Sequence, residues 1–122
     1  MDKAGLVYIH NQSKDSVIVY DADGKFVKSW GPEFAGGAHG FQINEEGGTE
    51  YIYFADVSRK IVVKATLAGE VVYTIKCPTE SGVYPDPGKF VPTNVAIAPN
   101  GNVYVADGYG SSYVHQYSAK GE

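Results

Sequence analysis

The chain has 122 residues, enough for one ordinary domain with a real hydrophobic core. Its formal net charge is −4, with acidic and basic residues interspersed, so neither a nucleic acid nor an anionic membrane is expected as a partner. No apolar stretch is long enough to span a bilayer, and the first residues lack the apolar segment of a signal peptide. The single cysteine, Cys77, excludes an internal disulfide and a cysteine pair for a metal.

The composition favours strands over helices. The chain holds 15 glycines, 6 prolines and 10 tyrosines, which is typical of short strands joined by tight turns. No window places apolar residues at helical spacing over three turns. We therefore predict an all-β fold with almost no helix.

Three successive segments each carry strands. The first segment has predicted strands at 6–11, 17–20 and 26–30, with a hairpin turn at Asp23-Gly24-Lys25. The second has predicted strands at 39–44, 50–55, 61–66 and 71–76. The polar hairpin 45–49 is assigned no function. The third has predicted strands at 93–98, 102–106 and 113–117, and a further strand is expected after Gly121.

These segments are copies of one repeat. A tyrosine stands three places before the closing Asn or Asp of a strand in each copy, in the pairs Tyr8 and Asn11, Tyr53 and Asp56, and Tyr104 and Asp107. The turn glycines Gly24, Gly69 and Gly121 recur at roughly the 40–50-residue period of a four-stranded propeller blade.

The repeat predicts a β-propeller segment of about two and a half four-stranded blades. Blade one covers 6–30 and lacks its inner strand, blade two covers 39–76, and blade three covers 93–122 and lacks its outer strand. Because propellers close with roughly 4–8 blades, we expect further blades from a longer propeller or from other copies of the chain.

The connection between blades two and three is unusually long. Residues 78–92 contain four prolines, and loops of this length are either disordered or functional. Val83, Tyr84, Phe90 and Val91 supply apolar anchors, so the connection is predicted to be ordered over one face of the blades.

Two further motifs stand out. The first is Ala38-His39-Gly40-Phe41 at the head of an inner strand. The second is Pro92-Thr93-Asn94-Val95-Ala96, followed by Val105-Ala106-Asp107-Gly108-Tyr109. With these motifs the repeat resembles the NHL-repeat β-propellers, and among these the six-bladed catalytic core of peptidyl-α-hydroxyglycine α-amidating lyase and its bacterial relatives.

The resemblance implies a zinc-dependent lyase that cleaves a peptidyl-α-hydroxyglycine into a peptide amide and glyoxylate. It implies that His39 binds zinc, that Tyr109 is the catalytic base, and that the Phe41 carbonyl binds a structural calcium ion. The family uses three zinc histidines, and the other two are expected from blades beyond residue 122. It also uses an arginine in the first matched blade, whereas the only arginine here is Arg59, in blade two. A periplasmic or secreted location follows if the resemblance holds.

Other interpretations stay open. The chain is alternatively a non-catalytic propeller that binds a protein, peptide or small molecule, with Tyr84, Phe90 and Tyr109 exposed on one rim. His39 is alternatively a turn residue between glycines, and Tyr109 a surface aromatic. The remaining expectations are a hydrogen-bonding role for His10, a solvent-facing His115, and a buried or edge thiol at Cys77. Turn-capping roles are expected for Asn11, Asp56 and Asp107, and interblade packing for Tyr8, Tyr53 and Tyr104.

Overall fold

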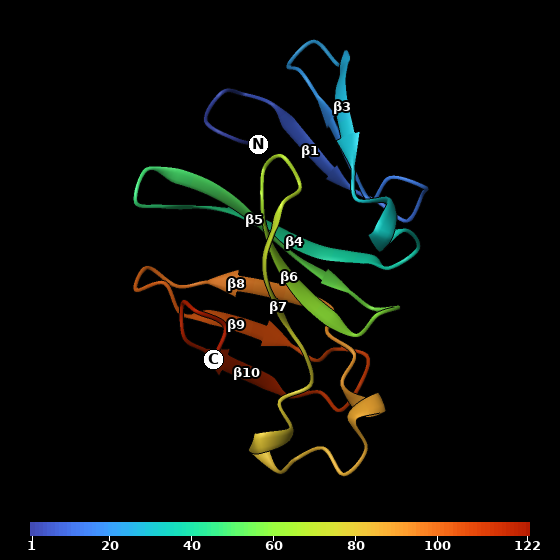
Figure 1. Cartoon of the computed structure of the whole chain (residues 1–122), viewed down its shortest axis with the longest axis vertical. Coiled ribbons are helices and arrows are strands. Elements are labelled where there is room, and N and C mark those ends of the chain that lie inside the picture. The colour runs from blue at the N-terminus through green and yellow to red at the C-terminus, as the bar shows by residue number, and fades with distance from the viewer.

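The computed structural model describes residues 1–122 and consists of three antiparallel sheets in an open row (Figure 1). The first sheet has the order β1 (Val7–His10), β2 (Val17–Tyr20), β3 (Phe26–Trp30). The second has the order β4 (Ala38–Glu46), β5 (Thr49–Asp56), β6 (Ile61–Thr66), β7 (Val71–Ile75). The third has the order β8 (Asn94–Ile97), β9 (Val103–Ala106), β10 (Val114–Tyr117).

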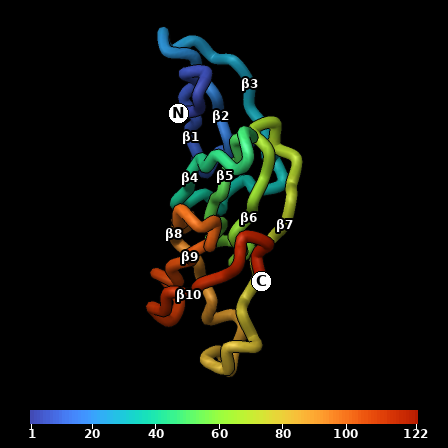
Figure 2. The backbone as a smooth tube through the Cα atoms, turned by 90° about the vertical axis from the view of Figure 1, so that its left-hand side faces the viewer, coloured from blue at the N-terminus to red at the C-terminus, as the bar shows by residue number.

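The predicted all-β fold is confirmed. The only helical elements are three 3-10 turns in the interblade connections, η1 (Pro32–Phe34), η2 (Thr79–Ser81) and η3 (Pro87–Lys89). The sheets follow the chain from one end of the molecule to the other (Figure 2). This arrangement is consistent with propeller blades, and we call the sheets blades one, two and three. The structure contains no helix with the length and hydropathy needed to cross a membrane.

Blade two separates two hydrophobic cores because β5 and β6 are apolar on both faces. Toward blade one it presents Ile52, Phe54, Val63 and Ala65, which pack with Tyr8, Val17 and Val19. Toward blade three it presents Tyr53, Ala55 and Val62, which pack with Val95, Val103 and Val105. Since side chains alternate across a strand, each residue of β5 from Ile52 to Ala55 joins the opposite core from its neighbours. Tyr8 and Tyr53 thus pack between blades as predicted.

The same hairpin turn follows the third strand of the repeat in every blade. In each turn a glycine with positive φ lets the chain reverse. The backbone hydrogen bonds that close these turns are Asp21 N to Lys25 O at 2.9 Å, Thr66 N to Glu70 O at 2.8 Å, and Ser118 N to Glu122 O at 2.6 Å. The third turn therefore starts the chain back along the free edge of β10, as it does before β3 and β7.

The β4–β5 hairpin is longer than predicted. Its strands run to Glu46 and from Thr49, so only Gly47 and Gly48 form the turn, both with positive φ. Glu46 accepts hydrogen bonds from Tyr53 Oη and Lys64 Nζ. The Lys64 ammonium is almost fully buried and lies 4.4 Å from the ring centroid of Tyr51. A hairpin that the sequence left unassigned thus carries an ion pair between a buried lysine and a partly exposed glutamate, with a cation–π contact.

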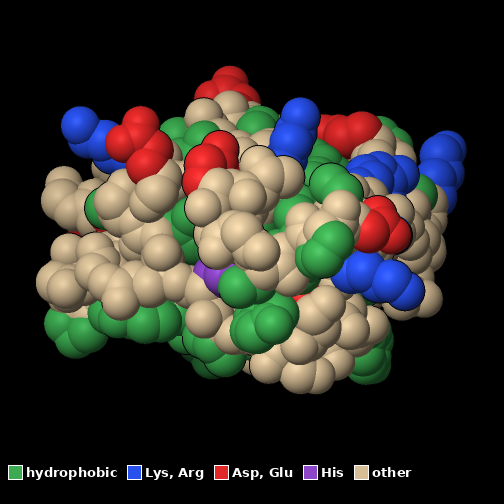
Figure 3. Space-filling model, turned by 90° about the horizontal axis from the view of Figure 1, so that it is seen from below, with side chains coloured by type: hydrophobic (Ala, Val, Ile, Leu, Met, Phe, Trp, Pro, Cys, Tyr) green, Lys and Arg blue, Asp and Glu red, His purple; other side chains and the backbone are tan.

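The view from below shows hydrophobic side chains along the lower margin of the molecule and charged ones along the upper margin (Figure 3). Apolar side chains are also exposed on the faces of blades one and three that point away from blade two. Val7 is 36% exposed, Ile9 43% and Val114 69%. The strands alternate here too, because His115 and Tyr117 point toward blade two while Val114 does not.

Candidate functional site

His39 and Tyr109 lie 70 residues apart in the sequence and meet in the structure. His39 is the second residue of β4, and Tyr109 is in the loop 107–112 between β9 and β10. The Nε2 atom of His39 is 3.1 Å from the Tyr109 hydroxyl oxygen. The two rings are perpendicular, with their centroids 5.0 Å apart. The two residues that the sequence singled out from separate motifs therefore form one hydrogen-bonded pair.

The orientation of the His39 ring is set by the backbone of blade three. Its Nδ1 atom is 2.6 Å from the carbonyl oxygen of Thr93. Because a carbonyl only accepts, Nδ1 carries the proton in the neutral ring and Nε2 is the acceptor for the Tyr109 hydroxyl. The N–H of Gly40 donates to the same carbonyl at 2.9 Å. A Cβ at Gly40 would lie 2.2 Å from Asn94 Oδ1, so only glycine allows this approach.

The pair borders an open depression on the surface. Its lining residues are His39, Gly40, Thr93 and Asn94. They come from the heads of β4 and β8, the inner strands of blades two and three, which pack side by side. Tyr109 is 68% exposed beside them. A ligand from solvent therefore has access to both polar atoms of the pair.

His10 supports the segment that carries His39. Its Nδ1 atom is 3.3 Å from the His39 carbonyl oxygen, as expected for a hydrogen-bonding histidine. The His10 ring packs on Phe54 with 4.9 Å between centroids and meets Phe41 at 5.9 Å. Burial lowers the pKa of His10 and outweighs the hydrogen bond to His39. The ring is therefore neutral, and its buried Nε2 atom has no hydrogen-bond partner.

No group of three or more His, Cys, Asp and Glu side chains is arranged to hold a metal ion. His39 offers one imidazole, and Phe41 is half-buried in β4, paired with Phe54 of β5. Cys77 is half-buried, and burial raises the pKa of its thiol, which disfavours the nucleophilic thiolate.

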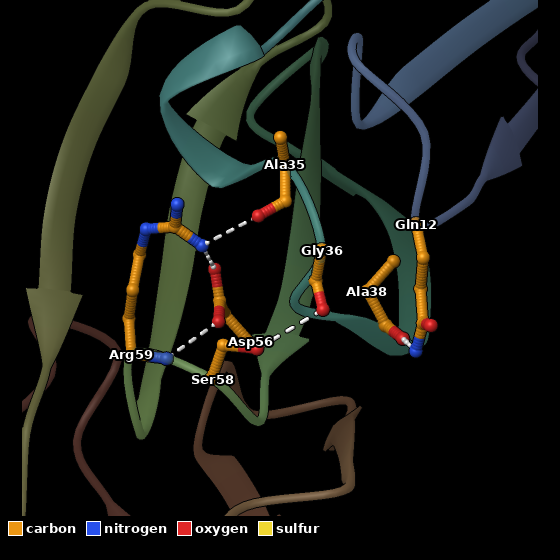
Figure 4. A network of polar contacts seen from close by, with 7 residues as sticks. All are labelled: Gln12, Ala35, Gly36, Ala38, Asp56, Ser58 and Arg59. Carbon is orange, nitrogen blue, oxygen red and sulfur yellow. Dashed lines mark hydrogen bonds and ion pairs between the residues drawn. The ribbon is translucent and has the colours of Figure 1, made fainter.

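Arg59 serves blade two itself. One guanidinium nitrogen, Nη1, donates to Asp56 Oδ2 at 2.9 Å and to the Ala35 carbonyl at 3.1 Å (Figure 4). The backbone N–H of Arg59 donates to Asp56 Oδ1 at 2.8 Å. Asp56 is thus a turn-capping residue, as predicted, and we call Asp56, Arg59 and the Ala35 carbonyl the Asp56 network.

Asp107 holds the corresponding place in blade three. Its Oδ1 atom accepts from the N–H of Val91 at 2.8 Å, and its Oδ2 atom accepts from the N–H of Ser111 at 2.8 Å. The Tyr84 hydroxyl donates to the same Oδ2 atom at 2.7 Å. His115 Nε2 is 2.7 Å from that hydroxyl. We call Asp107, Tyr84, His115 and the Val91 and Ser111 N–H groups the Asp107 network.

Two expectations are wrong here. Tyr84 is 6% exposed and Phe90 is fully buried, so neither is a rim aromatic, although both are the apolar anchors that the sequence predicted for the 78–92 connection. His115 is half-buried and hydrogen-bonded instead of solvent-facing. A sequence signal existed for His115, because it is two residues from the core residue Tyr117 and so shares its face of the strand.

A comparison with known proteins finds a distant relative of the chain that is a lyase. No family model matches the chain. The chain is 34% identical over 105 residues to peptidyl-alpha-hydroxyglycine alpha-amidating lyase 1 of Drosophila melanogaster. The alignment covers 83% of this chain and 18% of the fly protein, so the chain corresponds to less than a fifth of that relative's length. The chain is a distant homologue of this lyase.

Proposed function

We propose that this chain supplies two residues to the site of a lyase that acts on peptidyl-α-hydroxyglycine, with Tyr109 as the catalytic base and His39 as a zinc ligand. The observation that carries the proposal is the 3.1 Å contact between His39 Nε2 and the Tyr109 hydroxyl, across two blades and beside an open depression. The reaction class comes from the distant relative, whose name specifies that lyase.

The environment of His39 suits a metal ligand. Metal-binding histidines usually donate their other ring N–H to a carbonyl or carboxylate, as His39 Nδ1 does to Thr93. A catalytic zinc site needs about three protein ligands, so the remaining ones must come from other blades. When bound, zinc would polarise the substrate hydroxyl as a Lewis acid. The calcium site at the Phe41 carbonyl is likewise part of the proposal and would have a structural role.

Tyr109 has the position of a general base. In the structure its hydroxyl donates to His39 Nε2, the atom that would bind zinc. A bound zinc would take the place of this hydrogen bond, and Tyr109 would lose its proton before it acts as a base. A nearby positive charge favours the phenolate. The phenolate oxygen then takes the hydroxyl proton of the substrate, the C–O bond becomes a carbonyl, and the adjacent C–N bond breaks. The electrons of that bond pass to the nitrogen, which is protonated to the amide, and glyoxylate is released.

The outer faces of blades one and three have a role in this proposal. Their exposed apolar side chains and the turn that starts a strand along β10 suit packing against further blades, from a longer chain or from other copies. We call the protein with those blades in place the assembled protein. If instead other copies of this chain complete it, the mass in solution is a multiple of 13.1 kDa.

The test is glyoxylate release from a peptidyl-α-hydroxyglycine by the assembled protein, together with its zinc content. Tyr109→Phe should lower kcat by at least about 100-fold, the usual contribution of a general base. His39→Ala should lower the zinc content as well. Tyr20→Phe, on β2 of blade one, is the matched control and should retain activity. An assembled protein with neither turnover nor zinc would contradict the proposal and favour a non-catalytic binding propeller.

A further inference from the structure

The loop that carries Tyr109 is attached at its base to one buried carboxylate. Asp107 has no exposed surface, and its two oxygens accept from three donors in different parts of the chain. Ser111 belongs to the loop itself, whereas Val91 and Tyr84 belong to the 78–92 connection. The carboxylate thus links both ends of the Tyr109 loop to the segment in front of β8.

The direction of the hydrogen bonds within the Asp107 network follows from its donors and acceptors. Tyr84 has one hydroxyl proton, and an ionised carboxylate is the stronger acceptor for it. His115 Nε2 therefore carries a proton and donates to the Tyr84 oxygen at 2.7 Å. The chain of donors runs from His115 through Tyr84 to Asp107. The ring of Tyr84 is held edge-on against Phe90, with 5.7 Å between centroids.

The loop fits its neighbours so closely that it has little freedom to shift. A Cβ at Gly110 would lie 1.9 Å from the Lys89 carbonyl oxygen, and one at Gly108 would lie 2.3 Å from Thr93 Oγ1. The backbone N–H of Tyr109 also points to the Val91 carbonyl, at 3.4 Å. Thr93, on this same segment, orients His39 through its carbonyl. Residues 89–93 therefore contact both the loop that carries Tyr109 and the ring of His39.

We propose that Asp107, held by Tyr84 and His115, is a positioning residue that keeps the Tyr109 hydroxyl beside His39 Nε2. The inference rests on the proposed function of Tyr109 for its catalytic meaning, but the contact itself can be measured without any reaction. Hydrogen bonds from Val91, Tyr84 and Ser111 outweigh burial and hold the pKa of Asp107 below its ordinary value. The network therefore retains its charge, and its strongest hydrogen bonds, near neutral pH.

The experiment is NMR of the ¹⁵N-histidine-labelled full chain, which reports the state of His39 Nε2. Tyr109→Phe removes the hydrogen bond and defines the resonance position without it. Asp107→Asn replaces one carboxylate oxygen by an amide N–H₂ group, which faces the donors of the Asp107 network and cannot accept from them. Tyr84→Phe keeps the aromatic ring but removes the hydroxyl that joins Asp107 to His115. In both variants the His39 Nε2 resonance should move toward the Tyr109→Phe position. Asp56→Asn, at the equivalent place in blade two, is the matched control and should leave it unchanged.

The proposal would be overturned if Tyr84→Phe and Asp107→Asn both retained the wild-type resonance. Should Asp107→Asn fail to fold, the resonance of Tyr84→Phe alone tests the proposal, because this variant removes one hydroxyl oxygen and leaves the packing of the ring unchanged. In the assembled protein, Asp107→Asn should lower kcat by about 100-fold, as expected for a reacting group displaced by about 1 Å, with KM little changed. Asp107→Glu should recover part of that loss. A wild-type assembled protein without lyase activity would count against the proposed function, while the resonance shift would still support the positioning role.

Discussion

Blades two and three place a buried aspartate at the same point of the repeat and surround it differently. Asp56 and Asp107 each end the second strand of the repeat with no exposed surface. Asp56 is paired with Arg59, three residues further on, which neutralises its charge within one loop. Asp107 has no cation and depends on hydrogen bonds from Tyr84, 23 residues away, and from Val91.

The difference shows two ways to stabilise a carboxylate inside a blade. The Asp56 network is local, so it forms once its own loop and the Ala35 carbonyl are in place. The Asp107 network is non-local and forms only when the 78–92 connection has docked. The non-local Asp107 network is the one that holds the loop with the exposed Tyr109. The loop that carries Tyr109 is thus held at its base by a segment distant in the sequence.

The largest effect is expected from adding a methyl group where the blade-three loop meets the connection. Gly110→Ala would put Cβ 1.9 Å from the Lys89 carbonyl oxygen, a backbone atom that cannot rotate away, and 2.1 Å from Asp107 Oδ1. We expect a loss of about 3 kcal/mol in the free energy of unfolding, measured by urea denaturation. Gly88→Ala is the control, because its nearest atom, Asp86 Oδ1, is 3.1 Å away and the variant should lose much less. Equal losses in the two variants would mean that the two segments are not closely packed.

Removing the aspartate charge from each network in turn should destabilise the chain to different extents. Asp107→Asn turns an acceptor into a donor opposite Tyr84 and Ser111, and should cost about 2 kcal/mol because buried donors lose a charged partner. Asp56→Asn should cost about 1 kcal/mol, since Arg59 is partly exposed and water replaces part of the lost interaction. Urea denaturation of both variants measures the difference. A larger loss for Asp56→Asn would reverse the comparison.

Acid should reduce the contribution of the Asp107 network to the free energy of unfolding. The pKa of Asp107 is lower in the folded chain than its ordinary value, so its contribution to stability is fully present above that ordinary value. The contribution is lost as the pH falls through the lowered folded pKa. The free energy of unfolding of the wild type should therefore decline in acid more steeply than that of Asp107→Asn. Glu46→Gln, which removes another carboxylate with a lowered pKa, is a control whose effect should add independently.

The smallest effect is expected from Arg59→Lys. A lysine retains the charge, but its side chain is one atom shorter and does not place its nitrogen where Nη1 meets both Asp56 and the Ala35 carbonyl. Because Arg59 is partly exposed, the expected loss is about 0.5 kcal/mol, measured by thermal or urea denaturation. The His39 Nε2 resonance should not change, since this network does not contact blade three's loop. A shift of that resonance would show that the Asp56 and Asp107 networks are coupled.

The strands could be predicted from the sequence because their signals are local. Alternating apolar residues and glycines at Gly24, Gly69 and Gly121 determine where the chain extends and turns. The motifs also singled out His39 and Tyr109, but their contact needed the stacking of blades two and three. The sequence wrongly placed Tyr84 on an exposed rim and His115 in solvent, because the path of a proline-rich connection depends on the surface that it covers. Lys64 escaped assignment for a similar reason, since its counterion Glu46 comes from a hairpin tip.

The two-sided apolar character of β5 has a consequence for strand alignment. In most sheets a slip of one residue would turn apolar side chains outward, and this penalty selects the pairing. Here Ile52, Tyr53, Phe54 and Ala55 are all fully buried, so a slipped strand would still bury apolar groups. The ion pair between Glu46 at the end of β4 and Lys64 of β6 joins two different strands and matches in one alignment only. It therefore discriminates against misaligned strands, which the apolar interior of the blade cannot do.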